Sequence, residues 1–167
     1  MIRPLADGKQ PLPDGADIPA LLDGLPILLK IFLAMDGSLT RLLALTIGAP
    51  VVARIIPGEE GERRVFLGTN RYPELVMASS RMAPGGDFSR TWEILSDPRP
   101  IGTAFVERGE PMIRENLSFM RRSGTPITPD PWHGQPLWMR SYILSNMAGA
   151  RISIQEIFLP SLMEFLV

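Results

Sequence analysis

The spacing of the apolar residues changes from helical to strand-like near Pro50, and this change divides the chain into a helical first part and a mainly β remainder. Before that point a run of large apolar residues recurs every three or four positions, which predicts amphipathic helix. Pro26 lies within this run and can begin a second helix or kink the first. The residues of the run are Leu21, Leu22, Leu25, Leu28, Leu29 and Phe32.

A second helix is indicated from Leu39 to Ile47 by its flanking residues. Asp36-Gly37 is a turn signal, and Ser38 is a good N-cap. Gly48 is suited to end the helix.

After Pro50 the pattern takes a period of two, with β-branched residues and short turns between the runs. Strands are predicted over 51–56, 63–67 and 75–82, and together they form an antiparallel meander. Helical segments follow around 89–95 and 102–108.

The last third of the chain predicts further strands around a proline-rich segment. Residues 112–120 have a weak strand pattern, and 121–136 hold four prolines and two glycines, which favours a loop or lid. Residues 138–147 and 151–159 predict a hairpin that turns at Ala148-Gly149. We therefore expect an α+β fold, mostly antiparallel, with helices on one face of the sheet.

The composition says little about the fold, but it restricts the partners and cofactors that we expect. The 167 residues fit one domain over 20–167, preceded by an extended or mobile arm over 1–19 that is rich in proline and glycine. A net charge of -1 gives no reason to expect nucleic acid or a membrane as partner. No cysteine and one histidine, His133, make a metal site improbable. We expect a cytoplasmic protein without metal or cofactor.

Glu156 is the most informative single residue. If 151–159 is a strand, Glu156 shares a face with Ile152, Ile154 and Phe158, because side chains alternate. A buried carboxylate must be paired or carry a raised pKa, and a raised pKa suits a general acid. The alternative is an edge strand on which the face of Glu156 meets water.

Arg63 and Arg64 begin a predicted strand and must point to opposite faces. A buried arginine there would need an anion, such as the carboxylate of a small molecule. The alternative is that both are solvated charges flanking an edge strand. The helix start at residues 36–40 offers free N–H groups, which bind carboxylates but are by themselves a weak signal.

Five segments in order resemble the chorismate pyruvate-lyase family, and the resemblance covers about residues 25–160. The last segment, Glu-Ile-Phe-Leu-Pro, is the most specific. The five segments are MDGSLTR at 35–41, RRVFL at 63–67, PIG at 100–102, LWMRS at 137–141 and EIFLP at 156–160.

The resemblance implies a six-stranded antiparallel sheet with helices and two flaps that enclose the ligand, in a monomer. It places the arginine that grips the ring carboxylate at Arg63, favoured over Arg64 by counting back from Leu67. It places the backbone amides that share this carboxylate at Leu39 and Ile101. The catalytic carboxylate falls on Glu156, and Arg140 matches an arginine that could hold a second carboxylate.

The implied activity is elimination of pyruvate from chorismate to give 4-hydroxybenzoate, with Glu156 assisting by proton transfer. Three other functions remain open at this point. The first is a related lyase that acts on another enolpyruvyl ether or yields another hydroxybenzoate. The second is a non-catalytic protein that binds an aromatic acid through Arg63. The third is a protein-interaction module, which would lack an enclosed pocket around Glu156 and would have an exposed apolar patch elsewhere.

Overall fold

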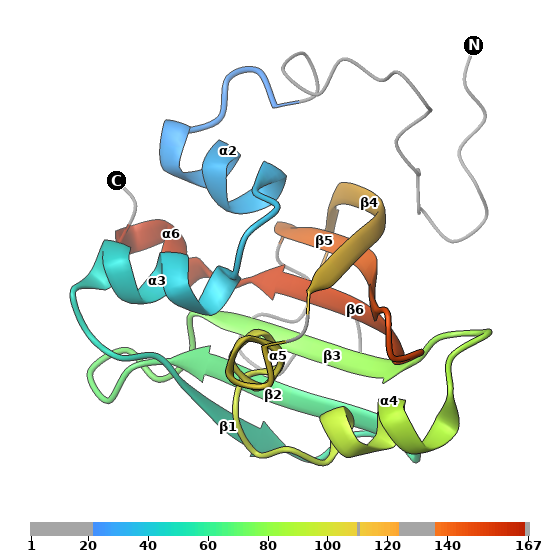
Figure 1. Ribbon diagram of the computed structural model, residues 1–167. Helices are drawn as coiled ribbons and strands as arrows, with labels where there is room; N and C mark the ends of the chain where they lie inside the picture. The colour runs from blue at the N-terminus through green and yellow to red at the C-terminus, as the bar shows by residue number, and fades with distance from the viewer. Residues whose placement is uncertain (1–21, 110, 124–135, 166–167) are drawn as a thin grey trace, which may run out of the picture.

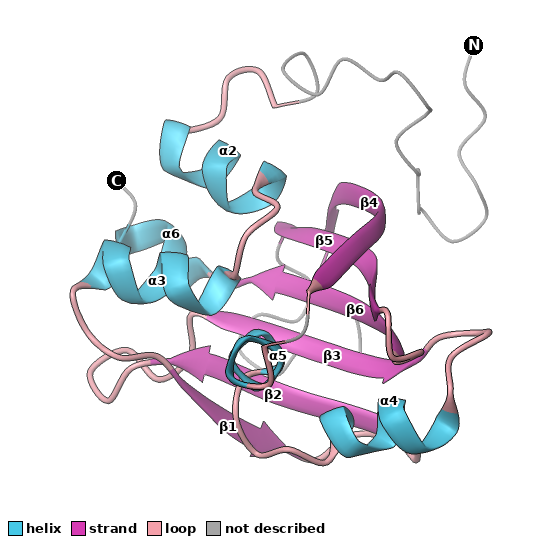
Figure 2. Cartoon of the chain, in the orientation of Figure 1, coloured by secondary structure: helices cyan, strands magenta, loops and turns pink. Residues whose placement is uncertain are grey.

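The structure is a computed structural model that describes residues 22–109, 111–123 and 136–165 (Figure 1). It is an α+β protein built on a six-stranded antiparallel sheet with strand order β1-β2-β3-β6-β5-β4 (Figure 2). The strands are β1 (Val52–Ile56), β2 (Glu62–Gly68), β3 (Val76–Met82), β4 (Met112–Ser123), β5 (Pro136–Asn146) and β6 (Arg151–Phe158). The described residues also form five helices: α2 (Ile27–Ala34), α3 (Leu39–Ile47), α4 (Phe88–Leu95), α5 (Ile101–Glu107) and α6 (Pro160–Phe165).

The sheet consists of two antiparallel units joined along β3 and β6. The first unit is the predicted meander β1-β2-β3, and the second contains the predicted hairpin of β5 and β6. The join sets Ala78 of β3 opposite Glu156 of β6, and Arg140 of β5 lies on the other side of Glu156. Glu156 therefore lies in the interior of the sheet, not on an edge strand.

The boundaries of α3 follow the predicted signals. The Ser38 hydroxyl accepts a hydrogen bond from the Arg41 backbone N–H at 3.3 Å, as an N-cap does. Gly48 ends the helix in the left-handed conformation with φ 72°. These two residues fix where the helix begins and ends, and the start of α3 lies at the cavity that forms the candidate site.

Three clusters of apolar side chains form the core. One packs α2, α3 and α6 against β2, β3 and β6, and a second packs α4 and α5 against β5 and β6. Strand β6 contributes Phe158 to the first of these clusters, and Ile152 and Ile154 to the second. The third cluster lies on the opposite face of the sheet and includes Ile157. Glu156 thus lies between the two clusters that hold the helices.

One sequence-based boundary was wrong. Strand β4 continues to Ser123 and β5 begins at Pro136, so both ends of the predicted loop 121–136 belong to the sheet. The reason is pairing across strands: Arg121 is in register with Trp138, which the local composition does not reveal. The arm 1–19 and His133 lie outside the described residues.

Among the glycines of the described residues, Gly68 has the least room for a side chain. A Cβ atom there would lie 2.3 Å from the Tyr72 carbonyl oxygen and 2.4 Å from the Pro73 carbonyl carbon, and both are backbone atoms. At Gly48 a Cβ atom would meet nothing within 4 Å, so an alanine would cost only the strain of the left-handed conformation, about 1–2 kcal/mol. We expect Gly68→Ala to lower the free energy of unfolding in urea by clearly more than Gly48→Ala. Equal losses would mean that the turn after β2 can move at little cost.

Candidate functional site

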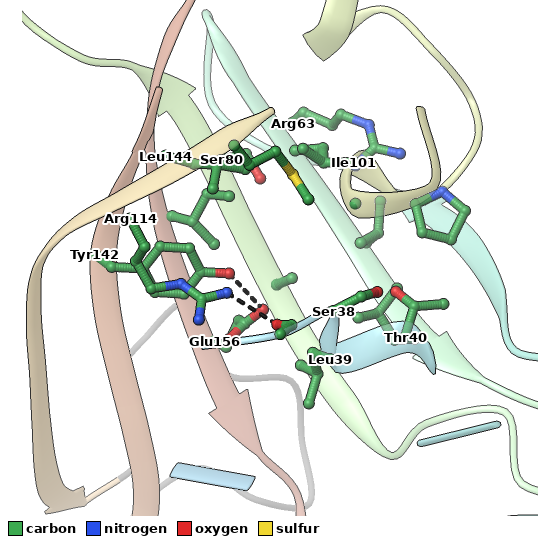
Figure 3. Close-up of a pocket in the computed structure, with 18 residues that line it drawn as sticks. Ser38, Leu39, Thr40, Arg63, Ser80, Ile101, Arg114, Tyr142, Leu144 and Glu156 are labelled. Carbon is green, nitrogen blue, oxygen red and sulfur yellow. Dashed lines mark hydrogen bonds between the residues drawn. The ribbon is translucent and has the colours of Figure 1, made fainter. Parts of the chain in front are cut away.

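A cavity lies between the two helix-bearing core clusters, over the centre of the sheet. It contains about 540 Å³ of space between atoms, part of which is open to solvent. Figure 3 shows its lining, which comes from β2, β3, β4, β5 and β6 and from the starts of α3 and α5. The residues that carry the chemistry are Ser38, Leu39, Thr40, Arg63, Ser80, Ile101, Arg114, Tyr142 and Glu156.

Small side chains on β3 help to leave this space open. Ser80 lies beside Arg63 in the sheet register, and Ala78 lies beside Glu156. Arg63 and Glu156 are therefore two strand spacings apart, roughly 10 Å, and offset by two residues along the strand, roughly 7 Å. The alternation puts both on the face that holds the cavity, with a surface of small side chains between them.

Arg63 is buried, with 8% of its surface exposed, and it lines the cavity. Its Nη2 donates to the Arg99 carbonyl oxygen at 2.8 Å, while its buried Nε has no acceptor among the described residues. Burial lowers the pKa of Arg63, and the negative charge of Asp97 partly opposes that shift. Arg64 points to the opposite face and pairs with Glu62 at 2.6 Å. Of the two arginines, only Arg63 lines the cavity.

Glu156 is also buried, with 4% of its surface exposed. Its carboxylate forms an ion pair with Arg140 and accepts a hydrogen bond from the Tyr142 hydroxyl at 3.0 Å. Of the two sequence-based alternatives for a buried carboxylate, the structure therefore has the paired one. A carboxylate held by two donors and lining a cavity can take up a proton from a bound molecule.

Arg140 lies behind Glu156 and does not line the cavity. Besides the carboxylate, its guanidinium donates to the carbonyl oxygens of Phe32 at 2.7 Å and of Leu33 and Met35 at 3.3 Å. Burial acts to lower the pKa of Arg140, but Glu156 and Tyr142 together outweigh burial and raise that pKa. Its position is that of a group that holds Glu156, and its predicted role as ligand of a second carboxylate stays a prediction.

Arg114 and Tyr142 line the cavity, and neither was a candidate from the sequence. The guanidinium of Arg114 lies over the Tyr142 ring, 4.3 Å from its centre. Burial and the neighbouring Glu156 carboxylate raise the pKa of Tyr142, so its hydroxyl stays protonated and can donate. Tyr142 could have been found by its alternation with Arg140 on β5. Arg114 could not have been found in this way. The register of β4 shifts between Glu115 and Ser118, so the strand pattern around Arg114 is weak and does not show which face its side chain occupies.

The starts of α3 and α5 meet at the cavity, and they bring Leu39 and Ile101 to its lining. The first amides of a helix have no acceptor within the helix. The two residues named from the sequence as backbone donors thus lie at the same cavity as Arg63 and Glu156 (Figure 3).

Comparisons with known proteins give no further guidance. No protein-family model matches the chain, and no curated protein matches it significantly. No helix among the described residues is long and apolar enough to cross a membrane. Over residues 22–109, 111–123 and 136–165, no group of three His, Cys, Asp or Glu side chains could hold a metal ion.

The pair of Arg140 and Glu156 makes a testable contribution to stability. Arg140→Met would leave a buried carboxylate without its cation, which typically costs 3–5 kcal/mol. We expect about that loss in urea unfolding, and we expect the double variant Arg140→Met/Glu156→Leu to recover part of it. Arg54→Met, which breaks an exposed ion pair with Glu74, should cost at most about 1 kcal/mol. A double variant no more stable than Arg140→Met alone would contradict the pairing.

Proposed function

We propose that the protein is a lyase that eliminates pyruvate from chorismate to give 4-hydroxybenzoate. The observation that carries the proposal is that Arg63 and Glu156, which the family resemblance implies as the arginine that grips the ring carboxylate and the catalytic carboxylate, line one cavity. Leu39 and Ile101 line the same cavity, although the four residues come from four separate segments of the chain. A chance resemblance would give no reason for all four to meet.

The chemistry of the cavity suits such a substrate. Chorismate carries two carboxylates on a compact ring, and its elimination leaves an aromatic product. Arg63 and the amides at the starts of α3 and α5 would hold the ring carboxylate at one end of the cavity. Glu156, two strands away, would then face the ring carbon that carries the hydroxyl.

In the proposed reaction the ring C–H bond beside the ether breaks, and the proton passes to the Glu156 carboxylate. The electron pair of that bond forms the third double bond of the ring, and the C–O bond to the enolpyruvyl group breaks. The enolpyruvate that leaves takes up a proton on carbon and becomes pyruvate. Tyr142 and Arg140 hold the Glu156 carboxylate in place before it acts. Their fixed orientation would lower the cost of reorganisation during the reaction.

The proposal includes the architecture that the family resemblance implies, with helices on one face of the sheet and flaps that close over the ligand. Closure would exclude water from the reacting groups. A related lyase that yields another hydroxybenzoate would use the same groups, so product identity is part of the test.

The first test is to incubate the pure protein with chorismate alone between pH 5 and pH 9. We expect release of pyruvate and 4-hydroxybenzoate in equal amounts, measured by a coupled pyruvate assay and by chromatography. No pyruvate at any pH would sink the proposal. Stoichiometric binding of 4-hydroxybenzoate without turnover would select a non-catalytic binder of aromatic acids.

The second test addresses Glu156. Glu156→Gln keeps the shape of the side chain but removes the proton acceptor, so turnover should fall by two orders of magnitude or more. Affinity for 4-hydroxybenzoate, measured by calorimetry, should change far less. The matched control is Glu62→Gln, which removes another buried, ion-paired carboxylate on the opposite face of the sheet and should leave turnover within about twofold. If Glu156→Gln retains turnover within threefold of the unmodified protein, the role assigned to Glu156 is wrong.

A further inference from the structure

The charged groups around the cavity do not balance. Three guanidinium groups, those of Arg63, Arg114 and Arg140, surround it or lie directly behind it, against the single carboxylate of Glu156. The count leaves two positive charges. Two more carboxylates, those of Asp36 and Asp97, lie near, but neither neutralises the cavity.

Asp36 lies 3.6 Å from Arg114, but its side chain is 89% exposed, so water screens the pair. Asp97 attracts Arg63, but its carboxylate accepts hydrogen bonds from the side chain and backbone N–H of Arg99. An excess of two positive charges in a largely buried site is the complement of a dianion.

Arg114 has donors to spare. A guanidinium has five N–H bonds. Its Nη1 donates to the Met35 carbonyl oxygen at 2.7 Å, and its Nη2 donates to the Gly37 carbonyl oxygen at 3.1 Å. The Nε–H is buried and has no acceptor among the described residues. The side chain is 10% exposed and lines the cavity, so a bound anion could accept from the donors that the two carbonyls leave unused.

Arg114 also has a fixed orientation. Its guanidinium stacks on the Tyr142 ring, and the two carbonyl groups hold its outer nitrogens. A planar guanidinium held in this way can bind a carboxylate through two parallel hydrogen bonds. Figure 3 shows Arg63 and Arg114 on opposite sides of the pocket, with Glu156 near Arg114.

Arg140 is less suited to this role. Its side chain is fully buried and does not line the cavity. Its guanidinium already donates hydrogen bonds to Glu156 and to three backbone carbonyl groups. We propose that Arg114 binds the second carboxylate of a dicarboxylate ligand whose first carboxylate is held by Arg63. The inference builds on the proposed function, in which this second carboxylate is that of the enolpyruvyl group. It makes Arg114 the residue that distinguishes dicarboxylates from monocarboxylates.

The test uses two stable aromatic ethers that differ by one carboxylate. 4-(Carboxymethoxy)benzoate carries a second carboxylate on its ether side chain, and 4-methoxybenzoate does not. We expect the unmodified protein to bind the dicarboxylate at least tenfold more tightly in calorimetry at low salt. Equal affinities would overturn the inference.

Arg114→Gln should reduce this preference to threefold or less and leave the affinity for 4-methoxybenzoate within about threefold. Arg63→Gln should weaken both ligands. The matched control is Arg41→Gln, which removes an exposed arginine of α3 and should leave the preference within twofold. A preference that survives in Arg114→Gln would overturn the inference.

Arg114 also holds the segment before α3, so a second variant guards against misfolding of the first. Arg114→Lys keeps the charge but lacks the planar fork, and the preference should fall at least threefold; an unchanged preference would count against Arg114. Failure of the proposed function is distinguishable, because the ether pair needs no turnover. A dicarboxylate preference that depends on Arg114, without turnover of chorismate, would uphold this inference and reject the lyase. Turnover of chorismate without a dicarboxylate preference would uphold the lyase and reject this inference about Arg114.

Discussion

The ion pair between Arg140 and Glu156 is the interaction on which the rest of the site depends. Two charges cannot be buried in the middle of a sheet unless each finds partners, because desolvation costs several kcal/mol per ion. Glu156 has Arg140 and the Tyr142 hydroxyl, and Arg140 also has the carbonyl groups at the end of α2. Those carbonyls are the unsatisfied acceptors that every helix leaves at its C-terminus. The needs of the helix end and of the guanidinium are thus met together.

This arrangement links the position of Glu156 to the wall of the cavity. Arg140 ties β5 to Phe32, Leu33 and Met35, and Arg114 ties β4 to Met35 and Gly37. The segment between α2 and α3 is therefore held from two strands, and Ser38 starts α3 directly after it. As a result the amides at the start of α3 and the Glu156 carboxylate are positioned by the same set of contacts. A ligand that bridges the two would meet a largely prearranged site.

Local patterns were enough to predict most of the strands, the cap of α3 and the apolar strand face on which Glu156 lies. The period-two runs predicted the meander, and the alternation around Glu156 put it on the face of Ile152, Ile154 and Phe158. The hydrogen-bond partners of the arginines around Glu156 could not be predicted from local patterns, because these partners are distant in the sequence. Arg140 binds a carbonyl 108 residues away, and Arg114 binds one 79 residues away. No spacing rule links such pairs, so local patterns offered no reason to name Arg114, and they did not reveal the contacts that Arg140 makes with Glu156 and with the carbonyl groups at the end of α2.

The family resemblance named candidate residues that the local patterns could not. The geometry of the structure now distinguishes two kinds of arginine around the cavity. An arginine that faces a carboxylate and helix carbonyls has its donors used by the protein itself, and removing it damages the fold. An arginine that lines a cavity with a buried N–H left over has a donor that the folded chain does not satisfy. An unsatisfied buried donor costs about 1–3 kcal/mol, so such a group is costly to keep unless a ligand uses it.

Arg63 and Arg114 are of this second kind, each with a buried Nε that lacks an acceptor in the described chain. Arg140 also has one unused nitrogen, but it is closed off from the cavity behind Glu156. Access to the cavity therefore separates the proposed binding groups from the supporting group better than burial does, since none of the three arginines is more than about 10% exposed.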